Sequence, residues 1–202
     1  MIDRRSILPR LRAALGRAAA LTIIAAGLIG VCGIQAGAAG SQATTGGQRE
    51  YLIKAAFLYD LIKTTGWPSG PSSHTVQICV VGSDPFGAAW RSIEGKPVGS
   101  RKLHIEARDS GQSFSDCNVL FIGDSEQGRV SQIIVGLGRS PILTVSEIAG
   151  FAKVGGIIRL MNVDNRLHFK VNLAAAHQAG LVISTEALKL ADSVQIEAGS
   201  AE

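Results

Sequence analysis

Small and acidic side chains follow three apolar stretches of the chain. They lie at residues 82–84, 123–126 and 144–147. If those stretches are neighbouring strands of a parallel sheet, their carboxyl ends meet at one edge, where such sheets bind ligands. Asp84, Ser125 and Glu126 are therefore candidates for contacts to a small ligand. The alternative is that residues of this kind only cap the helices that follow the strands.

The serine among these residues does not predict a hydrolase. Its surroundings read G-x-S-x-x-G from Gly123 to Gly128, whereas the nucleophile elbow of α/β-hydrolases needs G-x-S-x-G. The same loops lack the glycines and the lysine of a phosphate-binding loop. The four histidines are far apart in the sequence, so no local spacing predicts a metal site. We therefore expect a protein without catalysis, cofactor or metal.

Arg166 and His168 form a second candidate ligand site. They lie two residues apart in a stretch that alternates between apolar and polar side chains. Residues at this spacing share one face of a strand. Together they would offer two hydrogen-bond donors to an acidic group on a small ligand or a partner. An ordinary solvated strand face is the alternative interpretation.

Alternating strands and helices must position all of these residues. Apolar runs predict four strands, at residues 76–81, 103–107, 118–122 and 141–145. Helical patterns lie between them, at about residues 85–93 and 125–137. This order indicates an α/β fold with a mostly parallel sheet flanked by helices. A C-terminal hairpin is expected from residues 155–161 and 166–171, and two closing helices from residues 173–179 and 184–191.

The most apolar stretch, YLIKAAFLYDLIKTTGWP, spans residues 51–68. Its apolar side chains occupy most of a helical wheel, and a helix of this kind needs cover on more than one side. Gly66 and Pro68 should end the helix. We expect part of it to form a self-interface or a partner surface, with Phe57, Leu61 and Trp67 as candidates.

The first 38 residues have the layout of a secretory signal peptide. Five arginines precede an uncharged apolar run at residues 18–31, which is short of the roughly 20 residues that span a bilayer. A flexible linker is expected at residues 39–48, a single domain at 49–195 and a disordered tail at 196–202. Without the leader, 15 of the 20 basic and 15 of the 16 acidic side chains remain. A neutral domain of this kind offers no electrostatic surface for nucleic acid.

Cys79 and Cys117 are the cysteines that remain after residues 1–38. An exported protein reaches a compartment that permits disulfides. Each cysteine lies at or beside a predicted core strand, which favours a bond over two separate buried thiols. Closing a loop of this length stabilises a fold by about 4 kcal/mol on the chain-entropy account.

An ordered set of motifs resembles the YfiR-like family of bacterial periplasmic proteins. K-A-A-F-L-Y and W-P occur within residues 54–68, I-C-V-V-G-S-D-P-F-G at 78–87 and C-N-V-L-F-I-G-D-S-E at 117–126. P-I-L-T-V-S-E-I-A-G-F-A follows at 141–152, G-G-I-I-R-L at 155–160 and K-V-N-L-A-A-A-H-Q-A-G-L-V-I-S at 170–184. The resemblance covers nearly all of the chain after the leader.

This resemblance implies a periplasmic α/β domain without known catalysis. It implies a regulator that binds the periplasmic domain of an inner-membrane diguanylate cyclase, represses it, and so lowers cyclic-di-GMP and biofilm formation. It also implies a dimer, and Cys79 and Cys117 match one of the family's cysteine pairs. A second family pair has no counterpart, because no cysteine follows Cys117. The alternative function is a periplasmic protein that captures a small nutrient or signal molecule.

Overall fold

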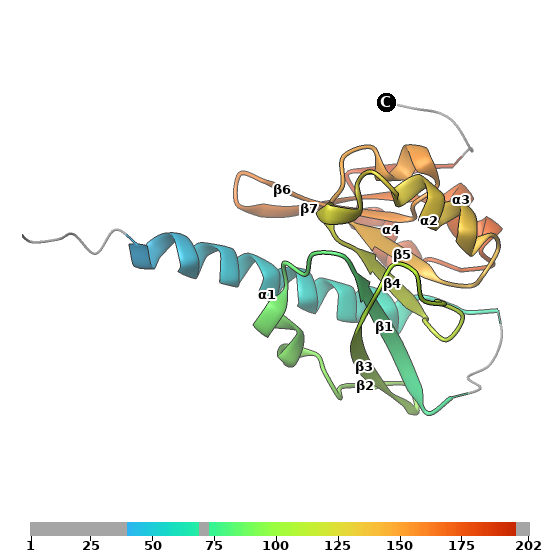
Figure 1. Ribbon diagram of the computed structural model, residues 1–202, viewed down its shortest axis with the longest axis horizontal. Coiled ribbons are helices and arrows are strands. Elements are labelled where there is room, and N and C mark those ends of the chain that lie inside the picture. Colours follow the sequence, from blue (N-terminus) through green and yellow to red (C-terminus); the bar gives the residue numbers. More distant parts are fainter. Residues whose placement is uncertain (1–39, 69–72, 197–202) are drawn as a thin grey trace, which may run out of the picture. The chain divides into compact units, whose positions relative to one another are not determined.

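A long helix runs along one face of the molecule (Figure 1). The computed structural model describes residues 40–68 and 73–196. Helix α1, Gly40–Thr64, buries Ala55, Leu58, Leu61 and Ile62 against a sheet. After the helix, Gly66 forms a bridge with Val182, which ties the helix end to the C-terminal part of the chain.

Helix α1 begins earlier than the sequence predicts. A linker is expected at residues 39–48, yet the helix starts at Gly40. Extending an existing helix adds one hydrogen bond for each residue fixed, so a packed helix can carry additional turns at its end. The predicted signal peptide at residues 1–38, and residues 197–202 of the predicted tail, lie outside the described residues. Among the residues described, no helix combines the length and the apolar character needed to cross a membrane.

In the described part of the chain, eight strands form one mixed, mostly parallel sheet in the order β2-β3-β1-β4-β5-β6-β7-β8. Their bounds are β1 Thr75–Val81, β2 Pro97–Val98, β3 Arg101–Arg108, β4 Val119–Ile122, β5 Leu143–Ser146, β6 Ile158–Val163, β7 Arg166–Asn172 and β8 Ser193–Gln195. Strands β3, β1, β4, β5 and β6 are parallel neighbours, whereas β2 and β7 run antiparallel to β3 and β6. The predicted α/β fold is confirmed, while the short strands β2 and β8 were not expected.

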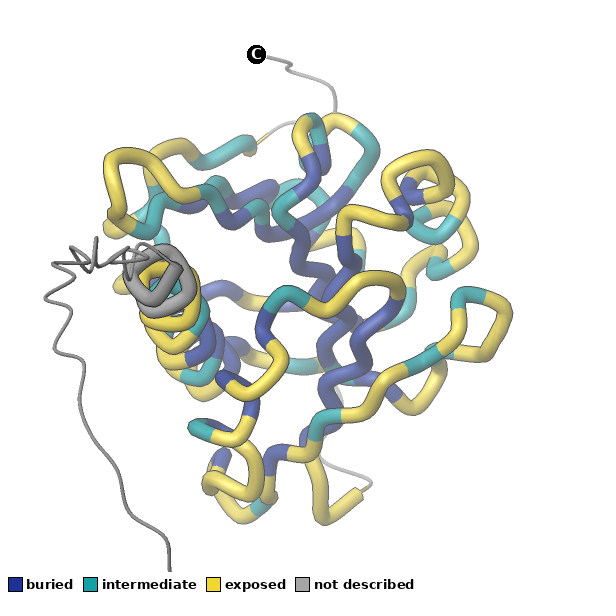
Figure 2. Tube along the Cα trace, turned by 60° about the vertical axis from the view of Figure 1, so that its left-hand side comes forward, coloured by how far each residue is buried: buried dark blue, intermediate teal, exposed yellow. Residues whose placement is uncertain are grey.

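The two faces of the sheet pack against different helices. On β1, Ile78 and Val80 belong to the larger core, which contains α1. Cys79 and Val81 alternate with them and belong to the smaller core, which contains α2, Val130–Leu137, and the short 3-10 helix η3, Phe151–Val154. Figure 2 shows that the buried segments gather in the central strands between these layers. Strands buried on both faces explain the continuous apolar runs of the sequence.

Two predicted helices are shorter than expected. In place of a helix at residues 85–93, the chain forms the 3-10 helix η1, Gly87–Ser92, because Gly87 takes a left-handed φ of 46° that interrupts an α-helix. In place of one helix at residues 125–137, the 3-10 turn η2, Asp124–Glu126, precedes α2. Gly128, between the two, favours a break because glycine has a low helix propensity.

The C-terminal hairpin and both closing helices are confirmed. Strands β6 and β7 meet at Asp164 and Asn165, whose φ angles of 52° and 58° suit a two-residue hairpin turn. Helix α3 is Leu173–Gln178 and α4 is Thr185–Leu190. Each helix has a side-chain cap, because Asn172 and Ser184 accept hydrogen bonds from the backbone at the helix N-termini.

The disulfide between Cys79 and Cys117 is also confirmed. It joins β1 to the residues just before β4, with 5.8 Å between the two Cα atoms. Both cysteines are buried. The bond therefore fixes two adjacent strands from within the smaller core.

Candidate functional site

The carboxyl ends of β1 and β4 are in direct contact. The backbone N–H of Ser83 donates to Ser125 Oγ at 2.8 Å, and the N–H of Ser125 donates to Ser83 Oγ at 3.2 Å. A Cβ atom on Gly123 would lie 1.9 Å from the carbonyl oxygen of Ser83, and one on Gly82 would lie 2.6 Å from Ser125 Oγ. The two loops therefore pack directly against each other.

Asp84 and Glu126, the other candidates at this edge, have partners within the fold. Asp84 Oδ1 accepts hydrogen bonds from the backbone of Phe86 at 2.9 Å and from Trp90 Nε1 at 3.0 Å. Glu126 is buried, and its carboxylate pairs with Arg129 at 2.6 Å. Asp84 thus fixes the turn before η1, whose N-terminus has no side-chain cap, and Ser125 joins the loops that follow β1 and β4. Glu126 pairs within its own segment.

A buried lysine connects α1 to the end of β5. Lys54 is 2% exposed and pairs with Glu50 one turn earlier and with Glu147, which follows β5. The Tyr51 hydroxyl donates to Glu147 Oε2 at 3.0 Å, and the lysine ammonium lies 4.4 Å from the centre of the Tyr51 ring. Burial raises the pKa of Tyr51, and the charge of Glu147 raises it further. Tyr51 therefore remains a protonated donor in this cluster.

This cluster was not predicted, because Lys54 and Glu50 appear in the sequence as the polar remainder of an apolar helix. No local pattern relates Lys54 to Glu147, which lies 93 residues further along the chain. A charged residue inside an otherwise apolar stretch was the available signal, since a buried charge requires a partner.

A cleft separates the N-terminal half of α1 from the β6–β7 hairpin, and we call it the hairpin cleft. Its volume is about 620 Å³, and Arg49, Glu50, Ile53, Asn162, Arg166 and Leu167 are among the residues that line it. Figures 1 and 2 both show the hairpin beside this half of the helix. Asn162 Nδ2 donates to Glu50 Oε2 at 2.5 Å, which connects the two walls.

Glu50 is ionised in this position. Burial alone would raise the pKa of its carboxyl, but hydrogen bonds from Lys54 and Asn162, together with the charge of the lysine, outweigh burial and lower the pKa. The charge of Glu50 is thus held between α1 and β6.

The predicted pair of Arg166 and His168 is divided between two environments. Arg166 is exposed and lines the hairpin cleft. His168 Nδ1 lies 2.5 Å from Asp192 Oδ1, and the other carboxylate oxygen of Asp192 accepts from the backbone N–H of Phe169 at 2.7 Å. His168 therefore holds the segment before β8, and Arg166 is the member of the pair available to a ligand.

The candidates for a partner surface also differ in exposure. Leu61 is 2% exposed and belongs to the core, so its assignment to an interface is corrected. Phe57 is half-buried, with its ring 4.4 Å from that of Phe169, and Trp67 is half-buried as well. The sequence shows that the helix is apolar on most sides, but the side left uncovered is decided by tertiary packing.

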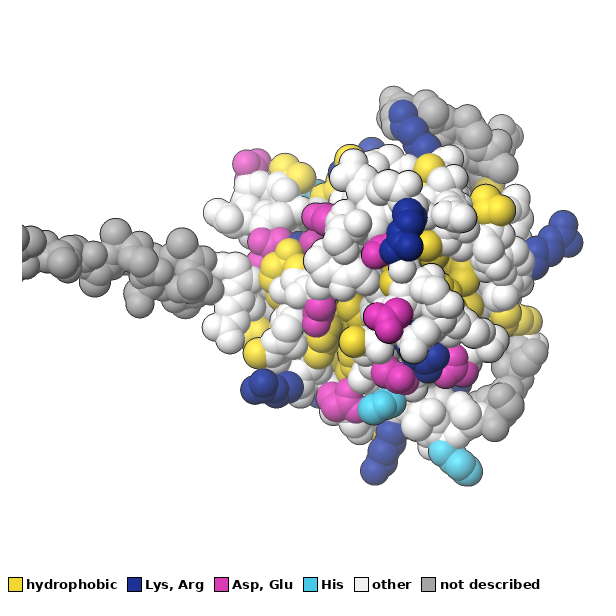
Figure 3. Space-filling view, in the orientation of Figure 1, with side chains coloured by type: hydrophobic (Ala, Val, Ile, Leu, Met, Phe, Trp, Pro, Cys, Tyr) yellow, Lys and Arg dark blue, Asp and Glu magenta, His cyan; other side chains and the backbone are white. Residues whose placement is uncertain are grey.

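The uncovered apolar side chains of this region belong to other residues. Leu52 is 43% exposed and Ile53 47% on α1, and Val163 is 46% exposed at the end of β6. We call these three residues the α1–hairpin surface. Figure 3 shows hydrophobic side chains around α1 interspersed with acidic and basic ones. Leu52 and Ile53 are adjacent in the helix, and exposed apolar side chains that form a contiguous patch are typical of a surface that binds another molecule.

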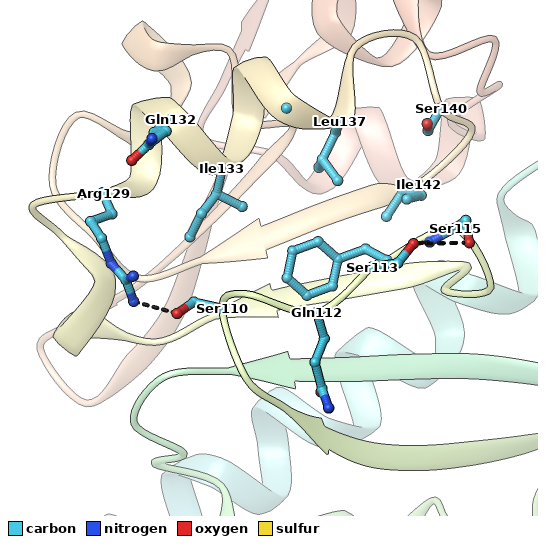
Figure 4. A pocket seen from close by; sticks show the side chains of 12 residues that line it. Ser110, Gln112, Ser113, Ser115, Arg129, Gln132, Ile133, Leu137, Ser140 and Ile142 are labelled. Atoms are coloured by element: carbon cyan, nitrogen blue, oxygen red, sulfur yellow. Dashed lines mark hydrogen bonds between the residues drawn. The ribbon is translucent and has the colours of Figure 1, made fainter.

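A second pocket lies between α2 and residues 110–115 (Figure 4). Its volume is about 460 Å³, and polar side chains such as Gln112 and Gln132 alternate with Ile133 and Leu137 around it. Arg129 is the charged residue that lines it, and its guanidinium already contacts Ser110 and Glu126. Across residues 40–68 and 73–196, no three His, Cys, Asp or Glu side chains gather as metal ligands would.

The fold and these sites define a disulfide-bonded α/β domain with a polar cleft and an exposed apolar surface beside it. A model of the YfiR/HmsC-like family matches residues 51–192, and the chain belongs to this family. The family resemblance seen in the sequence is therefore confirmed.

One solved structure with a similar arrangement is a conserved domain protein from Vibrio cholerae O1 biovar eltor str. N16961. It superposes with a TM-score of 0.49 and 10% sequence identity. The match covers 72% of this chain and 60% of the Vibrio chain.

Proposed function

We propose that this protein is a non-catalytic periplasmic regulator, which binds the periplasmic domain of an inner-membrane diguanylate cyclase and represses it. The consequence would be lower cyclic-di-GMP and less biofilm. Membership of the YfiR/HmsC-like family supports this proposal. The structural observation that carries it is the α1–hairpin surface, where Leu52, Ile53 and Val163 remain exposed.

A protein without catalysis regulates an enzyme by binding one of its states better than another. Apolar side chains that stay in contact with water gain free energy when a partner covers them, by about 25 cal/mol for each Å² buried. The α1–hairpin surface would therefore contact the cyclase or a second copy of this chain. The proposed homodimer and the proposed complex would use the same kind of contact.

Deletion of the gene in the native host tests this function. We expect cellular cyclic-di-GMP to rise and to return to its initial level when the wild-type gene is restored. A copy that carries Leu52→Lys should fail to restore it. Leu190→Lys is the matched control, because Leu190 is also an exposed leucine, 73% exposed, but lies on α4.

Two results would argue against the proposal. Unchanged cyclic-di-GMP after deletion would exclude repression of a cyclase. Full restoration by the Leu52→Lys copy would separate the regulatory function from the α1–hairpin surface. Immunoblots of periplasmic extracts should show equal amounts of the three proteins, so that a difference in restoration reports binding rather than abundance.

A further inference from the structure

We propose that the hairpin cleft binds a small organic anion with an apolar body, such as an aromatic carboxylate or sulfonate. This inference goes beyond the regulatory function above and does not depend on it. It assigns a ligand class to a site that lies between α1 and the β6–β7 hairpin.

The charges around the cleft favour an anion. Arg49, Lys54 and Arg166 line it, and Glu50 is the acidic residue that lines it. Lys54 is already paired with Glu50 and with Glu147 outside the cleft. In the described part of the chain, no acidic side chain lies within ion-pairing distance of Arg49 or Arg166.

These two arginines come from different walls of the cleft, one from α1 and one from β7. A guanidinium presents several donors in a planar fork, which matches the oxygens of a carboxylate, sulfonate or phosphate. Both arginines are exposed, so an anion can reach them without a change in the core. Glu50 also lines the cleft, and its negative charge favours a position of the anionic group beside the arginines rather than beside this carboxylate.

The other lining residues favour an apolar body. Ile53 is 47% exposed on the helix side, and Leu167 is half-buried on the strand side. The volume of about 620 Å³ is within the range of roughly 300 to 1,000 Å³ found for small-molecule sites. A ligand that combines an anionic group with a ring would cover the apolar side chains and neutralise an arginine.

The cleft is also held in shape before a ligand binds. Lys54, 2% exposed, contacts Glu50, and Asn162 donates to the same carboxylate from β6. These contacts fix the helix against the hairpin, so little ordering is required on binding. The pocket at α2 is a weaker candidate for an anion, because its lining arginine, Arg129, is already paired with Glu126 at 2.6 Å.

Binding of 8-anilinonaphthalene-1-sulfonate, an aromatic sulfonate, to the purified exported protein tests the proposal. We expect saturable binding with one probe molecule per chain, measured by isothermal titration calorimetry. Loss of a charge-assisted hydrogen bond costs about 1.5 to 3 kcal/mol, so Arg49→Gln combined with Arg166→Gln should weaken binding about tenfold or more. The neutral probe N-phenyl-1-naphthylamine, which lacks the sulfonate, should bind to the wild-type protein about tenfold or more weakly than the sulfonate probe does.

Arg139→Gln is the matched control. Arg139 is exposed, lies just after α2 and does not line the cleft. It should bind the sulfonate as the wild type does. The proposal is overturned if the wild type shows no saturable binding, or if the double variant binds with wild-type affinity. Circular dichroism checks the fold of each variant, and the two single variants provide the same comparison if the double variant unfolds.

Discussion

Lys54 of α1 and Glu147, the residue after β5, form an ion pair inside the fold. The lysine is 2% exposed, and Glu50 pairs with the same ammonium group from one turn earlier. Tyr51 donates its hydroxyl to Glu147 at 3.0 Å. Four side chains thus fix the helix that carries one wall of the hairpin cleft to the end of a central strand.

Replacement of this lysine should destabilise the protein strongly. Lys54→Met keeps most of the side-chain volume but leaves the carboxylates of Glu50 and Glu147 without their cation. Removing one partner of a buried pair costs roughly 3 to 5 kcal/mol. Because both carboxylates are partly exposed, we expect a loss near the lower end of this range, measured as the free energy of unfolding in urea.

Lys63→Met provides the control on the same helix. Lys63 pairs with Asp60 at 3.5 Å, but the two side chains are 46% and 73% exposed. Such surface pairs contribute about 1 kcal/mol or less. Equal unfolding free energies for the Lys54 and Lys63 variants would show that the buried pair does not hold α1 in place.

Two leucines of α1 should respond in opposite ways to the same substitution. Leu61→Lys places a charge in the core, because Leu61 is 2% exposed, and should prevent stable folding. Leu52→Lys changes a side chain that is 43% exposed, so the fold should persist while association through the α1–hairpin surface weakens. Circular dichroism reports folding, and light scattering reports the mass in solution.

Two outcomes would contradict the assignment of Leu52 to a self-interface. If the wild type is a dimer and Leu52→Lys has the same mass, Leu52 does not contribute to the self-interface. If Leu52→Lys unfolds as Leu61→Lys does, the exposed side of α1 has a structural role instead.

The carboxyl of Asp192 should contribute stability that depends on pH. Burial would raise its pKa, but hydrogen bonds from His168 and from the backbone of Phe169 outweigh burial and lower the pKa below the ordinary value of 3.8. A carboxyl with a depressed folded-state pKa stabilises the fold above its unfolded-state pKa. That contribution is lost as the pH falls through the folded-state pKa. The protein should therefore lose stability as the pH falls below about 4.

Asp192→Asn should remove part of this acid dependence, since asparagine does not titrate. Urea unfolding at a series of pH values from neutral to acidic would measure the change in slope. Asp109→Asn is the control, because Asp109 is exposed and forms no ion pair within the described ranges. Identical pH profiles for the wild type and Asp192→Asn would exclude a contribution from this carboxyl.

Local sequence patterns predicted most of the sheet. The runs that became β1, β4 and β5 are buried on both faces, and the alternation in β7 places Phe169 and Val171 in the core. A turn was also predicted between the two arms, at residues 162–165, and the structure narrows it to Asp164 and Asn165, residue types that tolerate a left-handed φ. Each of these features depends on residues that are close in the sequence.

Features that depend on distant residues were not predicted. Lys54 is buried because Glu147 meets it from the end of β5, and nothing near Lys54 in the sequence indicates this pairing. Leu61 was assigned to a surface because an apolar helix has no obvious outer side until the sheet covers one. Asp192, the hydrogen-bond partner of His168, follows α4 and is brought to β7 by tertiary structure.

The strand-end edge, where the sequence first placed a ligand, should respond sharply to a single methyl group. Gly123→Ala adds a Cβ that would lie 1.9 Å from the carbonyl oxygen of Ser83, a backbone atom that cannot move without the strand. Overpacking of this kind costs about 1 to 3 kcal/mol, and we expect a loss at the upper end. Thermal unfolding measures the loss.

Gly128→Ala is the control, because no atom lies within 4 Å of its added Cβ. If Gly123→Ala melts at the same temperature as Gly128→Ala, the ends of β1 and β4 are far enough apart to admit a ligand, and Ser125 and Glu126 become candidates for binding it again.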